Sequence, residues 1–501
     1  MLFRFANLLA IILFFIAMTA MGIYFARKNT STEEYFLGNR AFPSWAIGLS
    51  MLGTSISSVT FLAFPAAAFA LDYRQVVQNL TLPVAAVLAV IFFIPFFRQC
   101  ASASAFEYLE QRYGLAIRTY AAFSFVILNL VRLATVLYLI SIPLAEMFGI
   151  PILWIILICG VVVGAYTVLG GIEAVIWTDV VQTIILLGGG VLCLVLIVCE
   201  LPGGLPQIIE VGRECGKFSL GPMSWTLNER TFPVMILLGL VSFTTEYSSN
   251  QNVVQRYIAA KSLAAARRAT WLCTVMSIPT WLLFFFIGTC LFVFYRVFPA
   301  EAIQSCAPEE VLPYFILTNS PPFVGGIIIA ACIAAAMSSL DSAINAIATV
   351  CTIDFVKRLG KERSDREHLR IAKLISCGAG AVMIGGAILI NHVPKESMVD
   401  LGIILSSLFG GGILSIFLLG FFTTRVGNRA IITGTCVALA FNIYLMFNTF
   451  QWLPASLALP VHSYWTTILV NALLFAAAYL LSWFMPNRRD LAGLTVWTRR
   501  S

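Results

Sequence analysis

The stretch MLGTSISSVT, residues 51–60, decides how this sequence folds, because it carries five hydroxyl groups within an apolar segment that runs from about residue 42 to residue 70. In hydrocarbon an unsatisfied polar group costs several kcal/mol. A helix that opens here would free backbone carbonyl and amide groups to hold a cation or a solute. The hydroxyls could instead bond to their own helix and allow close packing. Five of them behind Gly53 favour a binding site; they are Thr54, Ser55, Ser57, Ser58 and Thr60.

The composition is that of a polytopic membrane protein. Of 501 residues, 60% are hydrophobic and only 11% are charged, whereas about a quarter of a soluble domain is charged. The first apolar run, from about residue 5 to residue 24, is longer than the core of a signal peptide and has no small-residue cleavage site. We therefore expect it to be retained as a helix.

Runs of about 20 apolar residues predict thirteen membrane spans. They cover approximately residues 5–26, 43–70, 75–98, 117–147, 150–168, 176–200, 232–248, 268–298, 322–352, 369–391, 398–421, 428–450 and 463–485. Most of the 31 lysine and arginine residues fall in one set of alternating loops and in the C-terminal tail. The positive-inside rule places that face in the cytoplasm and the N-terminus outside. Topology thus accounts for the net charge of +7, and no nucleic-acid partner is needed.

Several other classes of protein lack support in the sequence. The twelve cysteines include no CxxC pair, which argues against a zinc or redox site, although Cys215 and Cys306 in predicted outer loops could form a disulfide. The three histidines lie outside the predicted spans, which argues against haem. Neither a phosphate-binding G-x-x-x-x-G-K-[ST] loop nor a nucleophile–base pair is visible. We therefore expect neither an ATP-driven pump nor an enzyme.

A second polar interruption, SFTTEYSSNQN at 242–252, follows the apolar run that begins near residue 232. Transporter folds often contain two inverted halves whose first helices are broken at matching places. The two interruptions predict such halves. The expected division is an extra N-terminal helix with its loop (1–42), a first repeat (43–200), an outer loop (201–231), a second repeat (232–421) and two C-terminal helices with a tail (422–501).

A further polar run, AAMSSLDS at 335–342, lies within the span 322–352. Ser338 and Ser342 share a helix face, and with Ser339 they could meet freed carbonyls in the oxygen cage that hard cations prefer. Small-residue packing is the alternative. Asp341 shifts the balance toward function, because an ionisable residue within a span is expensive. Asp179, in GGIEAVIWTDVVQ at 170–182, either binds an ion or caps a helix near the interface.

Arg132 lies in the middle of the span 117–147. Its guanidinium is always charged and can bind a carboxylate with two hydrogen bonds. The carboxylate of a substrate and the side chain of Glu246 are both candidate partners, and we prefer the substrate because a buried ion pair needs excellent geometry. Gln75 and Asn79, four residues apart, could recognise hydroxyl or acetamido groups or simply end a helix.

Taken together, these features resemble the sodium:solute symporter family over nearly the whole chain. The motifs that carry the resemblance are EEYFLGNR (33–40), YTVLGGIEAVIWTDVVQTIILLGG (166–189), QNVVQRYIAAKS (251–262) and AAMSSLDSAIN (335–345). The resemblance implies an all-α membrane protein with the leucine-transporter fold, built from two inverted five-helix repeats and thirteen transmembrane helices. It also implies transport by alternating access with Na⁺ as the coupling ion and no organic cofactor.

The resemblance further implies which residues bind the ions. The main sodium site would use the carbonyls of Gly53, Ile56 and Ala335 and the hydroxyls of Ser338 and Ser339. A second sodium site, known in some members, would use Asp179, Ser338, Asp341 and Ser342. Asp341 departs from the family pattern, in which a hydroxyl residue is usual, so it could strengthen the second site or make it sensitive to protons.

Within the family the chain most resembles bacterial sialic-acid transporters, which use an arginine for the carboxylate of the sugar. The corresponding substrate residues would be Ser55, Ser57, Thr60, Gln75, Asn79, Arg132 and Phe243. We therefore expect a symporter of an acidic sugar in a bacterial inner membrane, with the lipid bilayer and no obligate protein as partner. A symporter of a neutral solute, with Arg132 paired to Glu246, is the nearest alternative, and a sodium-dependent sensor or channel is a more distant one.

Overall fold

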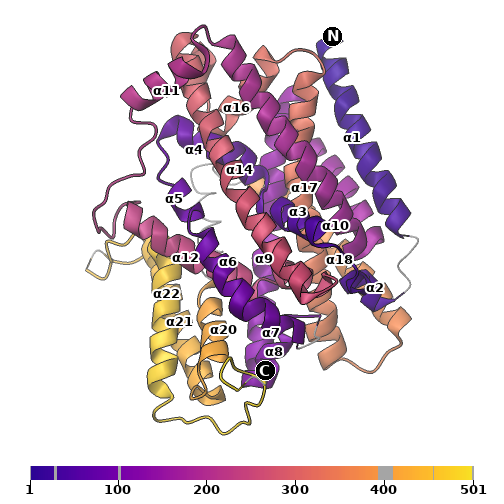
Figure 1. The fold of residues 1–501 in the computed structure, drawn as a ribbon, viewed down its shortest axis with the longest axis vertical. Helices are drawn as coiled ribbons and strands as arrows, with labels where there is room; N and C mark the ends of the chain where they lie inside the picture. The colour runs from indigo at the N-terminus through magenta and orange to yellow at the C-terminus, as the bar shows by residue number, and fades with distance from the viewer. Residues whose placement is uncertain (1, 27–30, 100–102, 393–409, 455, 499–501) are drawn as a thin grey trace.

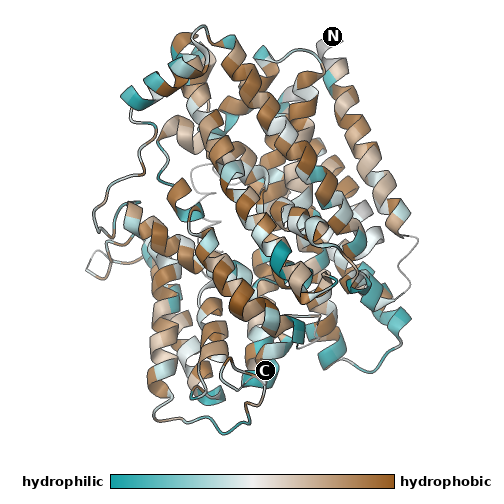
Figure 2. Cartoon of the chain, in the orientation of Figure 1, coloured by the Kyte–Doolittle hydropathy of each residue, from teal (hydrophilic) through white to brown (hydrophobic). Residues whose placement is uncertain are grey.

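The computed structural model of this chain describes residues 2–26, 31–99, 103–392, 410–454 and 456–498. Within these ranges the chain is helical and contains no β-strand, only two isolated bridges. Nine of the described helices are long and apolar enough to cross a membrane, or ten if one bent pair counts as a single span. Hydrophobic residues cover most of the long helices, and hydrophilic residues gather at the ends and connections (Figure 2).

The first part of the chain forms an N-terminal helix, a helix broken in two, and three further long helical segments. Its elements are α1 (Leu2–Ala26), α2 (Thr32–Leu37), η1 (Gly38–Arg40), α3 (Ser44–Ser55), η2 (Val59–Ala63), α4 (Phe64–Ala70), α5 (Val76–Asn79), α6 (Leu82–Leu88), η3 (Ala89–Phe93), α7 (Ile94–Gln99), α8 (Glu107–Tyr113), α9 (Leu115–Phe148) and α10 (Ile152–Glu200).

The second part begins with an amphipathic helix and also contains a broken helix. Its elements are α11 (Gly204–Glu214), α12 (Phe232–Ser249), α13 (Gln251–Ala259), α14 (Leu263–Val297), α15 (Glu301–Ser305), α16 (Pro308–Asn319), α17 (Val324–Val350), η4 (Cys351–Lys357), α18 (Asp365–Asn391), α20 (Ile413–Phe422), α21 (Asn428–Thr449) and α22 (Tyr464–Leu481). Figure 1 shows α20, α21 and α22 as a group beside the main bundle, at the lower left.

The predicted break at 51–60 is confirmed. The axes of the helical segments on its two sides, 44–55 and 59–70, differ by 60°. Ile56 leaves the helix with extended backbone angles (φ −102°, ψ 114°), and a π-helical turn follows at η2. A π-helix bonds each N–H one residue further back than an α-helix does and is frequent at functional sites. The carbonyls around Ile56 are therefore released from regular helical bonding.

The second predicted break is also confirmed. α12 ends at Ser249, Asn250 is extended (φ −76°, ψ 117°), and α13 begins at Gln251. The Asn250 side chain accepts a hydrogen bond from the backbone N–H of Asn252, which caps the new helix. Two interrupted helices are thus present among the described elements.

Most predicted spans correspond to helices, with three differences. The spans 150–168 and 176–200 are joined in α10, which changes direction at Gly171 (φ 59°, ψ −164°). Most of the span 398–421 lies outside the described residues, and α20 covers its end. The short helices α8, α11, α15 and α16 were not predicted, because each is too short or too polar to appear as an apolar run. Cys215 and Cys306 are both free, so the disulfide is not formed here.

The centre of the bundle is α17. Almost all of its residues are buried, and it packs against α1, α9, α10 and α18. A helix covered on every side has no lipid-facing surface, so its polar residues must face other protein groups, water or a ligand. The run of hydroxyl groups predicted from residues 335–342 lies on this helix.

Candidate functional site

The first cluster of polar groups lies where α17 meets the break after α3. The Ser338 hydroxyl is 2.9 Å from the carbonyl oxygen of Gly53 and 3.1 Å from that of Ala335. The Ser339 hydroxyl is 3.4 Å from the carbonyl oxygen of Thr54. Ile56, at the break itself, is fully buried. The structure thus brings Gly53, Ala335 and Ser338 into direct contact, with Ser339 beside them, while their role as sodium ligands stays a prediction.

Close packing at Gly53 keeps its carbonyl near α17. A Cβ atom at this position would lie 2.5 Å from the Thr183 hydroxyl and 3.6 Å from the Ser338 Cβ. Thr183 belongs to α10 and donates to the carbonyl of Leu49 on α3 at 3.1 Å. The absence of a side chain at Gly53 therefore lets α3 approach α10 and α17 at the same point.

A second cluster centres on Asp179, which is fully buried. It lies in the interior of α10 and not at an end of it, so the alternative that it caps a helix is wrong. Its Oδ2 accepts hydrogen bonds from the Ser50 hydroxyl at 2.5 Å and from Arg256 Nη2 at 2.7 Å. The same Arg256 nitrogen donates to the Ser342 hydroxyl at 2.7 Å. Two residues of the predicted second sodium site, Asp179 and Ser342, therefore share one guanidinium.

The other two residues of that predicted site lie on the same helix turn. Asp341 is fully buried; its Oδ1 accepts from the backbone N–H of Ser342 at 2.7 Å, and its Oδ2 lies 3.4 Å from the Thr178 hydroxyl. The Ser338 hydroxyl faces the first cluster. The Ser342 hydroxyl is 3.1 Å from that of Thr54, so the two clusters are continuous.

Arg256 was missed by reasoning from the sequence, which placed it among the cytoplasmic loop residues. The structure buries it on α13, with 1% of its surface exposed. Its Nε also donates to the Ser50 hydroxyl, and its Nη1 donates to the carbonyl of Asn252. The available signal was its position four residues after Asn252, which puts both polar side chains on one face of a short helix.

Several buried polar atoms around these clusters have no hydrogen-bond partner among the described residues. They are Ser58 Oγ, Asp179 Oδ1, both amide atoms of Gln182, Ser248 Oγ, Asn252 Oδ1 and both amide atoms of Asn345. Leaving such a group unsatisfied costs about 1–3 kcal/mol, so native proteins rarely do so. These eight atoms lie on α10, α12, α13, α17 and the break after α3, where water, an ion or a solute could supply the missing hydrogen bonds.

Arg132 is half-buried on α9 and points toward the first break. Its Nη2 donates to the carbonyl of Thr54 at 3.2 Å. The Glu246 carboxylate accepts instead from the Asn250 side chain at 2.6 Å. No ion pair joins Arg132 to Glu246 in the described part of the chain.

The remaining candidate substrate residues lie on or next to α3, η2, α5 and α12. Ser57 and Thr60 are buried and Ser55 is half-buried at the end of α3. Gln75 and Asn79 lie at the start and end of α5, which packs against α12. Phe243 of α12 lies against Trp281, with 5.6 Å between ring centroids. Within the described residues, no hydrogen bond or ring contact links these side chains directly to Arg132.

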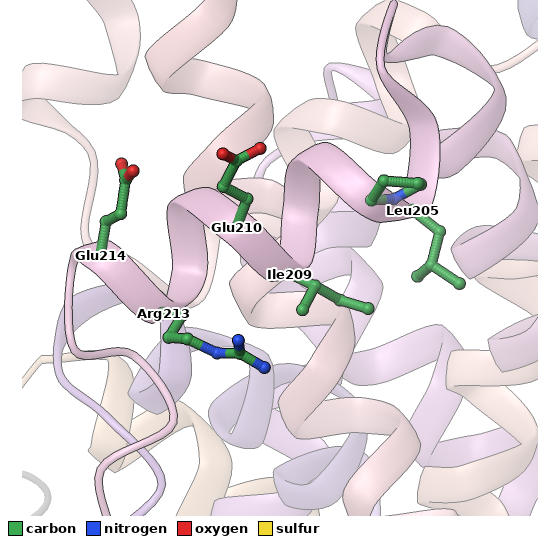
Figure 3. A pocket seen from close by; sticks show the side chains of 6 residues that line it. Leu205, Ile209, Glu210, Arg213 and Glu214 are labelled. Atoms are coloured by element: carbon green, nitrogen blue, oxygen red, sulfur yellow. The ribbon is translucent and has the colours of Figure 1, made fainter.

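Two hollows elsewhere are separate from the breaks. One of about 600 Å³ runs along α11 (Figure 3) and is lined by Leu205, Pro206, Ile209, Glu210, Arg213 and Glu214. All of these belong to one helix, so the hollow is open to the surroundings. The other, of about 430 Å³, lies among α2, η4 and α18.

Comparison with known proteins gives consistent results. The family model of the sodium:solute symporter family matches residues 35–437. The sodium/sialic acid symporter SiaT of Proteus mirabilis is 33% identical over 441 residues, which cover 87% of this chain and 88% of SiaT.

Two solved structures share the fold. One, of a Na⁺-coupled sialic acid symporter in a substrate-bound outward-open state that reveals a novel Na⁺ site, has a TM-score of 0.88 and 29% identity, and covers 96% of this chain and 98% of its own. Mhp1, a nucleobase-cation-symport-1 family transporter, has a TM-score of 0.59 and 15% identity, with 93% and 98% covered. The second likeness concerns the fold alone.

Proposed function

Because this chain belongs to the sodium:solute symporter family, we propose that it carries a sialic acid, or a similar sugar with a carboxylate, into the cell together with sodium. The relatives described as sodium/sialic acid symporters support the choice of substrate. The family is one of transporters, so no catalytic residues are assigned.

The observation that carries the choice of substrate is the position of Arg132. Its guanidinium lies at the break after α3, bonded to the carbonyl of Thr54 through one nitrogen. The described residues offer it no carboxylate partner, since Glu246 is bonded to Asn250. A guanidinium can hold a carboxylate by two parallel hydrogen bonds, which fixes both the position and the orientation of the ligand. Ser55, Ser57, Thr60, Gln75, Asn79 and Phe243 would surround the rest of the sugar.

Sodium would occupy the cluster around Ser338. In this proposal the carbonyls of Gly53, Ile56 and Ala335 and the hydroxyls of Ser338 and Ser339 form the main site. Asp179, Ser338, Asp341 and Ser342 form the second site, where an ion would share Asp179 and Ser342 with Arg256. All of these ligands are oxygen atoms, which suit a hard cation.

Coupling would follow from the shared break. The carbonyls of Gly53 and Thr54 lie on consecutive residues, one bonded to Ser338 and the other to Arg132. An ion that orders this segment also orders the carbonyl that positions Arg132. Sodium should therefore raise the affinity for the solute, and the solute should raise the affinity for sodium by the same factor.

The architecture proposed for this activity is the leucine-transporter fold with thirteen transmembrane helices. Residues 43–200 and 232–421 would form the inverted repeats, preceded by residues 1–42, separated by the outer loop 201–231 and followed by residues 422–501. The protein would lie in a bacterial inner membrane, with its N-terminus outside and its C-terminus in the cytoplasm. Alternating access would expose the site to each side in turn, without an obligate protein partner.

The test is uptake of labelled sialic acid into proteoliposomes with and without an inward sodium gradient. We expect uptake only with sodium. Arg132→Gln should raise the apparent KM roughly tenfold to a hundredfold, because hydrogen bonds to a charged group contribute about 1.5–3 kcal/mol each. Arg267→Gln is the matched control, since Arg267 also donates to a single backbone carbonyl, that of Val90 on η3, which is not part of the break.

An unchanged KM in Arg132→Gln would remove the carboxylate recognition from this proposal. Sodium-dependent uptake of a hexose or a neutral amino acid, with no uptake of sialic acid, would replace it by the neutral-solute alternative.

A further inference from the structure

The nine residues of α13 are all buried, with at most 3% of any of them exposed. Four of them are polar: Gln251, Asn252, Gln255 and Arg256. This helix half therefore closes one side of the polar clusters and cannot admit water while it stays in place. Its ends are held by contacts that the proposed transport does not explain.

Both ends of α13 are held by hydrogen bonds to Arg98, Ala103 and Ala105. At its first residue, the Gln251 side chain donates to the carbonyl of Ala103 at 2.7 Å and accepts from the backbone N–H of Ala105 at 2.8 Å. At its other end, Nη1 of Arg98, on α7, lies near three carbonyl oxygens. They belong to Tyr257 (2.8 Å), Ile258 (3.2 Å) and Ala260 (2.6 Å).

The end of α13 is also tied to the start of the other broken helix. The backbone N–H of Lys261 donates to the carbonyl of Phe42 at 3.1 Å, and Phe42 and Ala260 form an isolated parallel bridge. α3 begins two residues after Phe42. The halves α3 and α13 therefore share one anchored end, and a movement of one pulls on the other.

The electrostatics of this end favour a cation. The last carbonyls of a helix have no partner within it and carry the negative end of the helix dipole. Arg98 supplies both the missing donors and the positive charge. It is only half-buried, unlike Arg256 in the interior, so water can reach it first.

The same device occurs at the other broken helix, on the opposite face. Lys217, in the loop after α11, donates through Nζ to the carbonyls of Ala68 (3.3 Å), Phe69 (2.7 Å) and Leu71 (3.1 Å) at the end of α4. Its ammonium also lies 3.9 Å from the ring centroid of Phe292. Each broken helix thus has one half whose final carbonyls are held by a single cation from another element.

We propose that Arg98 is a positioning residue for the inner gate: it holds the shared end of α13 and α3 closed, and it must release the carbonyls of Tyr257, Ile258 and Ala260 before the site opens to the cytoplasm. Lys217 holds α4 in the corresponding way on the outer face. This inference rests on the alternating access proposed above, but not on the identity of the solute. Arg98 contacts neither the ion clusters nor Arg132 in the described structure.

The test measures opening on the inner side directly. Thr349 on α17 is fully buried and accepts a hydrogen bond from the Gln255 side chain on α13, so Thr349→Cys reports when α13 moves away. Labelling by N-ethylmaleimide is compared in purified protein with and without Thr349→Cys. We expect Arg98→Met to speed this labelling about tenfold, since charged hydrogen bonds exceed the free energy that a factor of ten represents. Arg98→Lys, which keeps the charge, should give a smaller rise.

The matched control is Lys217→Met, which removes the same number of hydrogen bonds to a helix end on the other face. It should not raise labelling at position 349, because it frees the end of α4 and leaves α13 held. An equal rise in Lys217→Met would overturn the proposal, because it would show general loosening rather than release of one gate. Unchanged labelling in Arg98→Met would overturn it as well.

If Arg98→Met does not fold, Arg98→Lys decides the question, and unchanged labelling in that variant overturns the proposal. Labelling needs no solute, so its outcome is independent of the sialic-acid assignment. A protein that fails to take up sialic acid yet shows the expected labelling would lose the proposed substrate and keep the gate.

Discussion

The hydroxyl of Ser338 lies 2.9 Å from the carbonyl oxygen of Gly53, so a side chain of the central helix α17 contacts the main chain of α3 next to its break. This contact joins the two halves of the fold, because α3 begins the first predicted repeat and α17 belongs to the second. A cation placed between these oxygens would bind both halves at once. The relative position of α3 and α17 would then depend on whether the ion is present.

Replacing Ser338 by Ala removes this hydroxyl without adding volume. We expect the sodium concentration for half-maximal uptake to rise roughly tenfold or more, because the ion loses one oxygen ligand in a buried site. Sodium titrations of uptake at a fixed solute concentration measure the effect. Ser277→Ala is the control, since Ser277 is equally buried but bonds only to its own helix, at Cys273. An unchanged sodium requirement in Ser338→Ala would remove Ser338 from the site.

Replacing Arg256 by Gln leaves the buried carboxylate of Asp179 without its cation. Breaking such a pair typically costs about 3–5 kcal/mol, so the thermal unfolding temperature should fall. Sodium should restore part of the loss, because it can neutralise Asp179 in place of the guanidinium. The measurement is thermal unfolding in detergent at low and high sodium. The double variant Asp179→Asn/Arg256→Gln lacks the carboxylate and should respond to sodium no more strongly than the parent. A sodium response of Arg256→Gln that is no larger than that of the parent would contradict the shared site.

The number of sodium ions can be read from the effect of the membrane potential. One sodium with one monoanion moves no net charge, whereas two sodium ions move one positive charge and gain about 2.3 kcal/mol per 100 mV. With both proposed sites filled, uptake of sialic acid into proteoliposomes should rise under an inside-negative potential. Ser342→Ala, which removes a hydroxyl of the second site, should weaken this dependence. If uptake does not depend on the membrane potential, only one sodium ion is transported and the second site is not used.

The contacts of Glu110 predict a dependence of stability on acidic pH. Hydrogen bonds from Arg358 are the largest cause that holds the pKa of Glu110 below its usual 4.5, and Arg118 adds to it. A lowered pKa means that the stabilisation is present above that usual value and is lost as the pH falls through the lowered one. Glu110→Gln should therefore unfold at a lower temperature than the parent at about pH 7.

The difference should be small, because the pair with Arg358 is exposed and exposed ion pairs contribute about 1 kcal/mol or less. The buried Arg118 keeps its ion pair with Asp354. The difference should disappear in sufficiently acidic solution, where Glu110 is protonated in the parent. Thermal unfolding of the two proteins across this pH range checks the expectation. A difference that persists unchanged at the acidic end would mean that Glu110 acts through packing and not through charge.

The breaks could be predicted from the sequence because hydrocarbon makes polar residues conspicuous. Five hydroxyls in residues 51–60 favour a break over bonding to their own helix at membrane depth, and Ser338 and Ser342 are four residues apart on one helix. Local composition and helical spacing were sufficient there. The contact between Ser338 and Gly53 depends on packing, and only the resemblance to a known family suggested it.

Arg256 could not be placed in the same way. It follows a polar stretch and precedes Lys261, so hydropathy assigned it to a cytoplasmic loop. Its burial results from tertiary contacts with Ser50, Asp179 and Ser342, which come from three separate helices. Gln182 could have been noticed in the sequence, because it is an amide three residues after Asp179 within an apolar run. Both of its side-chain polar atoms are buried without a hydrogen-bond partner among the described residues.

In the proposed main site, three of the five sodium ligands are carbonyl oxygens, at Gly53, Ile56 and Ala335. A substitution scan that scores side chains would find steric intolerance at Gly53, where a Cβ meets Thr183, and little chemical preference at the other two positions. Such a scan would therefore not identify these residues as sodium ligands. Replacing the peptide bonds themselves, for example by backbone esters that weaken the carbonyl as a ligand, is the kind of perturbation that would reveal them.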